Sequence, residues 1–351
     1  MKYFSMFSGI GGFEYGINKA TKARCVGFSE IDKYASSIYQ KHYPKHRNFG
    51  DATTIDTNEL EDFDLLVGGF PCQAFSIAGK QLGFCDTRGT LFFEIARVLE
   101  DKRPRYFLLE NVKGLLSHDK GKTFQTILEV LTSLGYEFEY QVLNSKDFGV
   151  PQNRERVFIV GHFGGSSKRK VFPIIRKPGK AIKKIINKGH DGTNIYSKKG
   201  SAVTQKALGG GQGAKTGLYA VPTTTEGNTH AIDTNYFKGC NELNKGRRTQ
   251  VAVPVSDVTR LNKEQNGRRF KTNNESSFTL TQQDKHGVYD GFRIRRLTPK
   301  ECERLQGFPD DWTKYSFDGK EISDTQRYKC LGNAVTTNVI TAIIERMKFT
   351  S

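Results

Sequence analysis

The sequence has no CxxC pair and no apolar run of about 18 residues, the length that a transmembrane helix needs, so we expect no membrane span. Its six cysteines form no even framework. This argues against a metal site and a disulfide scaffold and fits a reducing, cytoplasmic compartment. The N-terminal residues lead directly into a strand-like segment, so we expect no signal peptide.

Acidic residues are scarce in one part of the chain. Residues 168–271 contain 22 Lys and Arg but only 6 Asp and Glu, and they hold most of the formal net charge of +17. A concentrated basic block indicates a polyanionic partner, most simply nucleic acid. The alternative is a solvated basic surface without a specific partner.

The first 165 residues alternate short apolar segments with amphipathic ones. This rhythm predicts a doubly wound α/β sheet. We expect strands over residues 3–7, 25–29, 65–67, 106–109, 138–143 and 157–160, and helices over residues 13–20, 33–42, 91–100 and 123–134. From about residue 164 to 291 the chain is rich in Gly, Lys, Asn and Thr, which predicts a second, loop-rich β domain. Helices return over residues 297–306, with Thr298 as N-cap, and 337–347.

A cysteine lies directly after an apolar strand, in the stretch Gly69-Phe70-Pro71-Cys72-Gln73. A turn at this point places the Cys72 thiol at the rim of the sheet, where open α/β folds bind ligands. Thiolate is a strong, soft nucleophile, suited to attack on an electron-poor ring carbon. A single cysteine in a turn is more often inert, so this motif needs support from others.

Two further segments follow predicted strands. The glycine-rich stretch 7–12 comes after the first strand and opens a helix, and Glu30 closes the second strand. This spacing is typical of nucleoside binding, in which the carboxylate accepts hydrogen bonds from ribose hydroxyls. Asp51 stands before the third strand, where it is able to accept a hydrogen bond from an adenine amino group or simply to form a turn.

Charged side chains also mark the later strands. Glu110 ends a strand and is placed to hold or donate a proton at a ring nitrogen. Arg154 and Arg156 alternate on one face of an extended segment and are suited to grip a carbonyl oxygen or a phosphate. A surface cluster of ion pairs is the alternative interpretation.

Taken together, the motifs resemble the DNA (cytosine-5) methyltransferase family of bacterial and bacteriophage restriction-modification systems. The resemblance rests on residues 7–12, Glu30, Asp51, 71–73, 110–112, 152–156, 296–299, 303–309 and 331–335. It covers residues 1–165 and 292–351 closely.

The resemblance implies a Rossmann-like methyltransferase sheet that uses S-adenosylmethionine. By this analogy Cys72 attacks C6 of a cytosine flipped out of double-stranded DNA, and Glu110 engages N3 and the amino group. Arg156, helped by Arg154, holds O2. It also implies a catalytic domain of residues 1–165 with 324–351. A target-recognition domain of residues 166–323 follows, with its variable part over 166–291 and a hinge motif over 292–323.

The same resemblance assigns binding residues. Cofactor contacts are expected from Phe7, Gly9, Ile10, Gly11, Gly12, Glu30, Ile31, Asp51, Ala52, Gly69, Pro71, Asn333 and Val335. Contacts with DNA are expected from Ser76, Lys80, Arg88, Thr204, Gly209, Gly210, Arg268, Arg269 and Thr279. Ile31 departs from the pattern, because many relatives have a large aromatic residue at this point.

We expect a monomer that acts on double-stranded DNA in the cytoplasm of a bacterium or a phage-infected host, either alone or beside a restriction endonuclease with the same target site. Three alternatives remain. A tRNA cytosine-5 methyltransferase of the same family would not need the long basic middle region. A nicotinamide-dependent oxidoreductase would leave Cys72, Glu110 and Arg156 without a role, and a non-catalytic DNA-binding regulator would not need the thiol.

Overall fold

A computed structural model describes residues 1–71, 91–164, 170–176, 297–347 and 349, together with six short strands between residues 184 and 295. The chain forms two compact units. The first comprises residues 1–181, 201–209 and 298–351, and the second comprises residues 182–200 and 210–297. Residues 298–323 therefore belong to the first unit. The division into catalytic and target-recognition domains at residues 165 and 324 stays a prediction.

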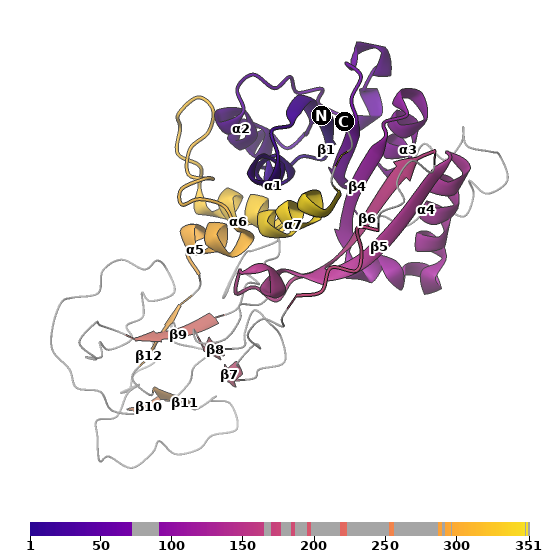
Figure 1. The fold of residues 1–351 in the computed structure, drawn as a ribbon. Helices are drawn as coiled ribbons and strands as arrows, with labels where there is room; N and C mark the ends of the chain where they lie inside the picture. Colours follow the sequence, from indigo (N-terminus) through magenta and orange to yellow (C-terminus); the bar gives the residue numbers. More distant parts are fainter. Residues whose placement is uncertain are drawn as a thin grey trace. The chain divides into compact units, whose positions relative to one another are not determined.

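The first unit is built on a six-stranded sheet in the order β2-β1-β3-β4-β6-β5 (Figure 1). Its strands are β1 (Lys2–Met6), β2 (Arg24–Ser29), β3 (Leu65–Gly69), β4 (Tyr106–Val112), β5 (Tyr136–Asn144) and β6 (Glu155–Phe163). Strands β2, β1, β3 and β4 are parallel, whereas β6 is antiparallel to both β4 and β5. The predicted α/β sheet is confirmed, and its parallel part carries the crossover helices.

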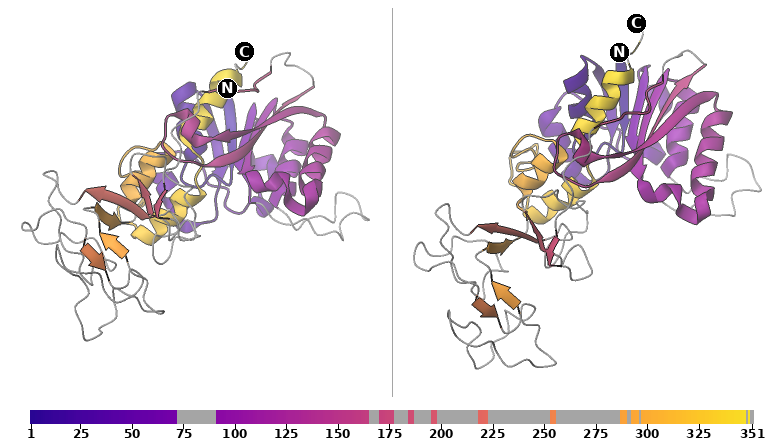
Figure 2. Two further views of the ribbon diagram at one scale, coloured as in Figure 1. Left: turned by 90° about the horizontal axis from the view of Figure 1, so that it is seen from below. Right: turned by 60° about the horizontal axis from the view of Figure 1, so that its bottom comes forward.

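Helices cover both faces of this sheet (Figure 2). The helices described in this unit are α1 (Gly12–Ala20), α2 (Lys33–His42), α3 (Leu91–Lys102), α4 (Lys122–Ser133), α5 (Pro299–Gln306), α6 (Asp324–Asn333) and α7 (Thr337–Met347). Helices α3 and α4 pack in the apolar cluster of one face, and α1 and α7 pack in that of the other. Short 3₁₀ turns are η1 (Ala52–Thr54), η2 (Thr57–Glu59), η5 (Lys113–Leu116), η6 (His118–Gly121) and η7 (Ser145–Phe148).

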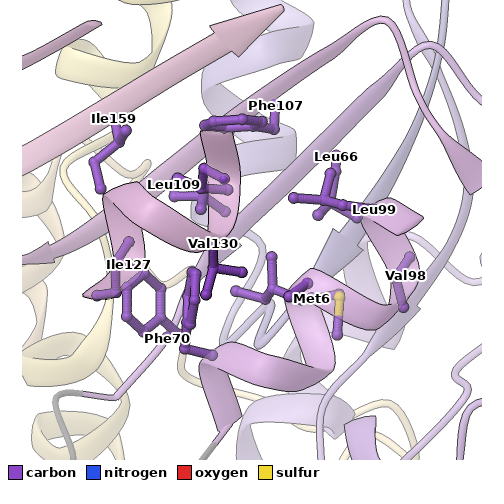
Figure 3. Packing of buried hydrophobic residues seen from close by; sticks show 14 of the residues in the cluster. Met6, Leu66, Phe70, Val98, Leu99, Phe107, Leu109, Ile127, Val130 and Ile159 are labelled. Carbon is purple, nitrogen blue, oxygen red and sulfur yellow. The ribbon is translucent and has the colours of Figure 1, made fainter. Parts of the chain in front are cut away.

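Alternate residues of β4 belong to the two faces of the sheet. Phe107 and Leu109 pack in one cluster with apolar residues of α3 and α4 (Figure 3). Tyr106 and Leu108 belong to a second cluster with residues of α1 and α7. Because successive side chains of a strand point to opposite faces, an uninterrupted apolar run indicates a strand that is buried on both sides.

Helices α1 and α7 come together although they lie far apart in the sequence. A Cβ atom at Gly16 would lie 2.6 Å from Cβ of Ile340, so only glycine allows this approach. The hydroxyl of Thr341 also donates to the Gly16 carbonyl at 3.0 Å. The C-terminal helix is therefore an integral part of the sheet domain.

The predicted elements of the first unit agree with the structure to within a few residues. Thr298 is the N-cap of α5, in a capping box with Glu301. Helix α6 was not predicted, since its sequence is mostly polar. Within the described residues, no helix is long and apolar enough to cross a membrane.

The second unit contains two small sheets. One has the order β12-β9-β8-β7 and the other pairs β10 with β11. Their strands are β7 (Lys184–Ile186), β8 (Ile195–Ser197), β9 (Leu218–Pro222), β10 (Val253–Val255), β11 (Gly287–Tyr289) and β12 (Phe292–Arg295). The strands that the structure describes in this unit are short, as a loop-rich β domain requires.

Candidate active site

The carboxyl ends of the four parallel strands define one edge of the sheet. In β1, Met6 is in register with Ser29 of β2 and with Gly68 of β3, and Gly69 is in register with Glu110 of β4. Every candidate segment that follows a parallel strand therefore starts from this edge. Ligands of open α/β sheets bind in this position.

The loop after β1 has the conformation that its glycines predict. Phe7, Gly9 and Gly11 all have positive φ, at 54°, 56° and 86°. Gly11 is the N-cap residue of α1, and as a glycine it has no side chain to cap this end of the helix. The N–H groups at a helix N-terminus suit a polar or anionic ligand.

Glu30 is bound to this loop by its carboxylate. The N–H of Gly9 donates to Oε2 of Glu30 at 2.8 Å, and the N–H of Asp32 donates to Oε1 at 2.8 Å. Burial raises the pKa of Glu30, and these two donors partly oppose the rise. The next residue, Ile31, is 72% exposed.

Asn48 joins two candidate cofactor segments. The sequence analysis did not predict it as a site residue. Its Oδ1 accepts from the N–H of Glu30 at 3.3 Å and from the N–H of Gly50 at 2.9 Å. Its Nδ2 donates to the Glu30 carbonyl at 3.1 Å and to Oγ of Ser36 at 2.9 Å. A single amide thus fixes Glu30 beside the segment that precedes Asp51. Only the fold brings these groups together.

Asp51 and Ala52 have different environments. The Asp51 side chain is exposed and accepts from the N–H of Thr53 at 2.9 Å, as the N-cap residue of η1. Ala52 is buried in the apolar cluster below. Of this pair, only Asp51 presents a polar group to solvent.

The C-terminal motif reaches the glycine loop through Val335. A Cβ atom at Gly12 would lie 2.8 Å from Cγ2 of Val335, and one at Gly69 would lie 3.9 Å from Cγ1. Gly12, Gly69 and Val335 therefore meet at the carboxyl end of the parallel strands. Ile10 is buried, whereas Pro71 and Asn333 are exposed.

Glu110 and Arg156 form an ion pair that is mostly buried. Nε of Arg156 lies 3.0 Å from Oε1 of Glu110. Arg156 is in register with Val112, so it lies diagonally opposite Glu110 on the antiparallel pair of strands. The other oxygen, Oε2, lies 3.3 Å from the position of a Cβ atom at Gly69. The carboxyl group therefore faces the last residue of β3.

Asn111 fixes the start of the segment that leads to Cys72. Its Nδ2 donates to the carbonyl of Phe70 at 3.0 Å, and both residues are buried. This bond joins the end of β4 to the chain two residues before the cysteine. It is a second feature that the spacing of the motifs did not predict.

Arg154 has a different role from the one its alternation with Arg156 suggested. It is buried, and its guanidinium donates to the carbonyls of Gly332 at 3.1 Å and Ala334 at 2.8 Å. Burial and the charge of Arg156 lower its pKa to about 9, so it stays protonated at neutral pH. Arg154 therefore fastens the C-terminal motif to the segment that carries Arg156.

Ten predicted residues lie outside the part of the chain that the structure describes. They are Cys72, Ser76, Lys80, Arg88, Thr204, Gly209, Gly210, Arg268, Arg269 and Thr279. Their assignments stay predictions.

Comparison with known proteins identifies the family. The family model for C-5 cytosine-specific DNA methylases matches residues 1–349. The chain is 35% identical to an orphan methyltransferase, M.SPRI, of Bacillus phage SPR, over 99% of this chain and 97% of the relative. It is 36% identical to the type II methyltransferase M.NlaX of Neisseria lactamica, over 99% of this chain and 96% of the relative.

Solved structures agree on the fold. The Dnmt2 methyltransferase of S. pombe superposes with a TM-score of 0.61 at 20% identity, covering 99% of each chain. The chain belongs to the family of C-5 cytosine-specific DNA methylases, and it is a DNA cytosine-5 methyltransferase of the restriction-modification type.

Proposed function

We propose that this chain transfers a methyl group from S-adenosylmethionine to C5 of a cytosine flipped out of duplex DNA, through a covalent bond between Cys72 and C6. The observation that carries the proposal is the Glu110–Arg156 pair, whose carboxyl group faces Gly69 at the same edge as the glycine loop. A carboxyl and a guanidinium at one edge match the N3 and O2 side of a cytosine ring.

The residues of the glycine loop fit the cofactor. The carboxylate group of S-adenosylmethionine suits the N-terminus of α1. The ribose hydroxyls of the cofactor suit the carboxylate of Glu30. A Cβ atom at Gly9 or Gly50 would meet nothing within 4 Å among the described residues, so there is space beside both segments. Asp51 would accept from the adenine amino group, with Ile31 against the ring. When bound, the cofactor supplies an electrophilic methyl group on a positively charged sulfur.

The chemistry on the cytosine follows from its electron distribution. C6 is a poor electrophile until N3 is protonated, so a nucleophile and a proton donor must act on opposite edges of the ring. The Cys72 thiolate would add to C6 while Glu110 binds the N3 edge and supports its protonation, and Arg156 binds O2. The ring becomes an enamine whose C5 is nucleophilic and takes the methyl group as the bond between methyl and sulfur breaks. A water then removes the C5 proton, the C6–S bond breaks to release the thiolate, and N3 gives up the proton that it had gained.

Arg154 would support this chemistry by positioning the segments beside the site. Its bonds to the carbonyls of Gly332 and Ala334 hold the segment that leads into β6. Arg156 would then present its guanidinium to O2 from a fixed backbone, and Val335 would stay against the cofactor loop. A positioned group gains more rate than a mobile one.

Recognition of DNA would involve the segment that follows Cys72 and the basic region of the chain. Base flipping is required because a stacked cytosine does not expose both faces of its ring. Residues 76–88 would close over the DNA, with Lys80 and Arg88 at phosphates, and the basic region 166–291 would read the target sequence. We further propose that the enzyme acts as a monomer, either alone or beside an endonuclease with the same target site.

Two measurements test the proposal. Methyl-labelled S-adenosylmethionine is supplied with duplex DNA, with tRNA or without nucleic acid, and label is expected in the DNA alone. Label in tRNA alone, or in neither, would refute the assignment. Duplex DNA that carries 5-fluorocytosine should then trap the covalent intermediate, since fluorine cannot leave as a proton does. Mass spectrometry should find the crosslink on Cys72, and a crosslink on another residue would reject that nucleophile.

A further inference from the structure

The only tryptophan of the sequence contacts the glycine loop from a distant part of the chain. Nε1 of Trp312 donates to the carbonyl oxygen of Ile10 at 2.9 Å, across 302 positions of sequence. The same peptide unit is held on its other side, where the N–H of Gly11 donates to the Ser8 carbonyl at 3.1 Å. Trp312 thus fixes the orientation of the peptide that leads into the N-terminus of α1.

Aromatic rings fix the indole itself. The ring of His42 stacks on Trp312, with centroids 3.5 Å apart and planes inclined by 6°. Tyr15 and Phe308 pack against it at centroid distances of 5.1 and 5.2 Å. His42 Nε2 also lies 2.8 Å from the Trp312 carbonyl oxygen. An indole held on several sides has little freedom to turn away from Ile10.

A buried ion pair fixes the backbone on both sides of the tryptophan. Oε2 of Glu303 accepts from the N–H of Asp311 at 2.7 Å, and Oε1 accepts from the N–H of Thr313 at 2.9 Å. Arg327 contributes the opposite charge, with Nη2 of its guanidinium 3.0 Å from Oε1 of Glu303. Glu303 is fully buried, so its bonds to Asp311 and Thr313 restrict the backbone on both sides of Trp312.

We propose that Trp312 is a positioning residue for the cofactor loop, and that its fluorescence reports cofactor binding. The inference rests on the proposed role of this loop in binding S-adenosylmethionine. The Ile10–Gly11 peptide lies between glycines with positive φ, which have more backbone freedom than other residues. Without a donor from the indole, this peptide keeps only its bond to the Ser8 carbonyl and gains freedom to rotate. The loop then has to be ordered when the cofactor binds, and the affinity falls.

The variant Trp312→Phe removes the donor and keeps an aromatic ring. Its matched control is Tyr136→Phe, which removes another buried bond to a main-chain carbonyl, from Tyr136 to Pro104 at 2.8 Å on the edge strand β5. Isothermal titration calorimetry should show a rise of about three- to tenfold in the Kd for S-adenosylmethionine in Trp312→Phe. The control should bind as the wild type does.

Kinetics separate positioning from a general loss of stability. In Trp312→Phe the KM for S-adenosylmethionine should rise in step with the Kd, with kcat at saturating cofactor and the affinity for DNA unchanged. Equal Kd values in Trp312→Phe and wild type would overturn this inference and leave the proposed function intact. A wild-type protein that binds no S-adenosylmethionine would overturn both.

The wild-type protein gives a test that needs no variant. Because Trp312 is the only tryptophan, emission excited at the indole band has a single source. Titration with S-adenosylmethionine, without DNA, should change this emission with the same Kd as calorimetry. An emission that stays constant at saturating cofactor would show that the indole does not sense the loop, and would overturn the inference even if Trp312→Phe failed to fold.

Discussion

Nε of Arg156 and Oε1 of Glu110 lie 3.0 Å apart. They belong to the antiparallel strands β6 and β4, at the end of the sheet where the parallel strands have their carboxyl ends. Each group neutralises the other, so a mostly buried site holds a carboxyl and a guanidinium without an unbalanced charge. Asn111, next to Glu110, binds the backbone that leads to Cys72. One strand end therefore contributes both to the charged pair and to the start of the segment that leads to Cys72.

Arg156→Lys should reduce kcat/KM by about 10- to 100-fold and leave the fold intact. Lysine keeps the charge but loses the planar set of donors that holds both Glu110 and a carbonyl oxygen. Steady-state methylation of duplex DNA measures the loss. Lys113→Arg is the control. The Lys113–Glu155 ion pair is exposed, so replacing its lysine by arginine should not alter the rate. Full activity in Arg156→Lys would contradict the assigned contact with O2.

Arg154→Met should lower the free energy of unfolding by about 2 to 5 kcal/mol, since the carbonyls of Gly332 and Ala334 lose their donor in a buried place. Denaturant unfolding of the full chain measures this change. Lys22→Met, at an exposed position, should change stability by less than about 0.5 kcal/mol. If the two variants were equally stable, Arg154 would not fasten the C-terminal motif.

Asn48→Ala should raise the KM for S-adenosylmethionine by about tenfold, because Glu30 and Gly50 lose their shared partner. DNA binding measured without cofactor should not change. Asn58→Ala is the matched control, since Asn58 is exposed and its side chain bonds locally to Asp56. An unchanged KM in Asn48→Ala would mean that Glu30 is positioned without it.

Glu14→Gln should change how stability depends on pH. Neither carboxyl oxygen of Glu14 forms a hydrogen bond with a described residue, and burial raises its pKa to about 7, although nearby Ser5 and Tyr39 partly oppose the rise. Between about pH 4.5 and 7 the folded state keeps a proton that the unfolded state releases. This contribution of Glu14 to stability is therefore present at pH 4 and is lost as pH rises through 7.

The difference in unfolding free energy between Glu14→Gln and wild type isolates this effect. It should shift in favour of the variant by about 3 kcal/mol from pH 4 to pH 8. Burial raises the pKa of Cys25 to about 12 and that of Tyr3 above its ordinary value, so these neighbours do not titrate in this range. Exposed Glu129→Gln should show no such shift. A difference that is independent of pH would refute the raised pKa.

Cys72→Ser should retain DNA binding and lose methylation by about 10³-fold or more, because a serine hydroxyl is a far weaker nucleophile toward C6. Gel-shift titration and label transfer measure the two properties separately. Cys25→Ser replaces a buried cysteine of the core and should keep a methylation rate far above that of Cys72→Ser. Turnover that survives in Cys72→Ser would require a different nucleophile.

The sequence by itself determined the α/β sheet, most helices, and the grouping of glycines, Glu30, Glu110 and Arg156. Local periodicity sets these elements, and a strand end fixes the edge at which a following side chain appears. Helix α6 was missed because it is held by packing rather than by its own propensity.

Only the tertiary structure decided which charged and polar groups meet. The bonds of Asn48, the separate contacts of Arg154 and Arg156, and the contact between Trp312 and Ile10 join segments from different parts of the chain. Hydrogen bonds act over about 3 Å, so their partners depend on how helices and strands pack. No pattern within one segment contains that information.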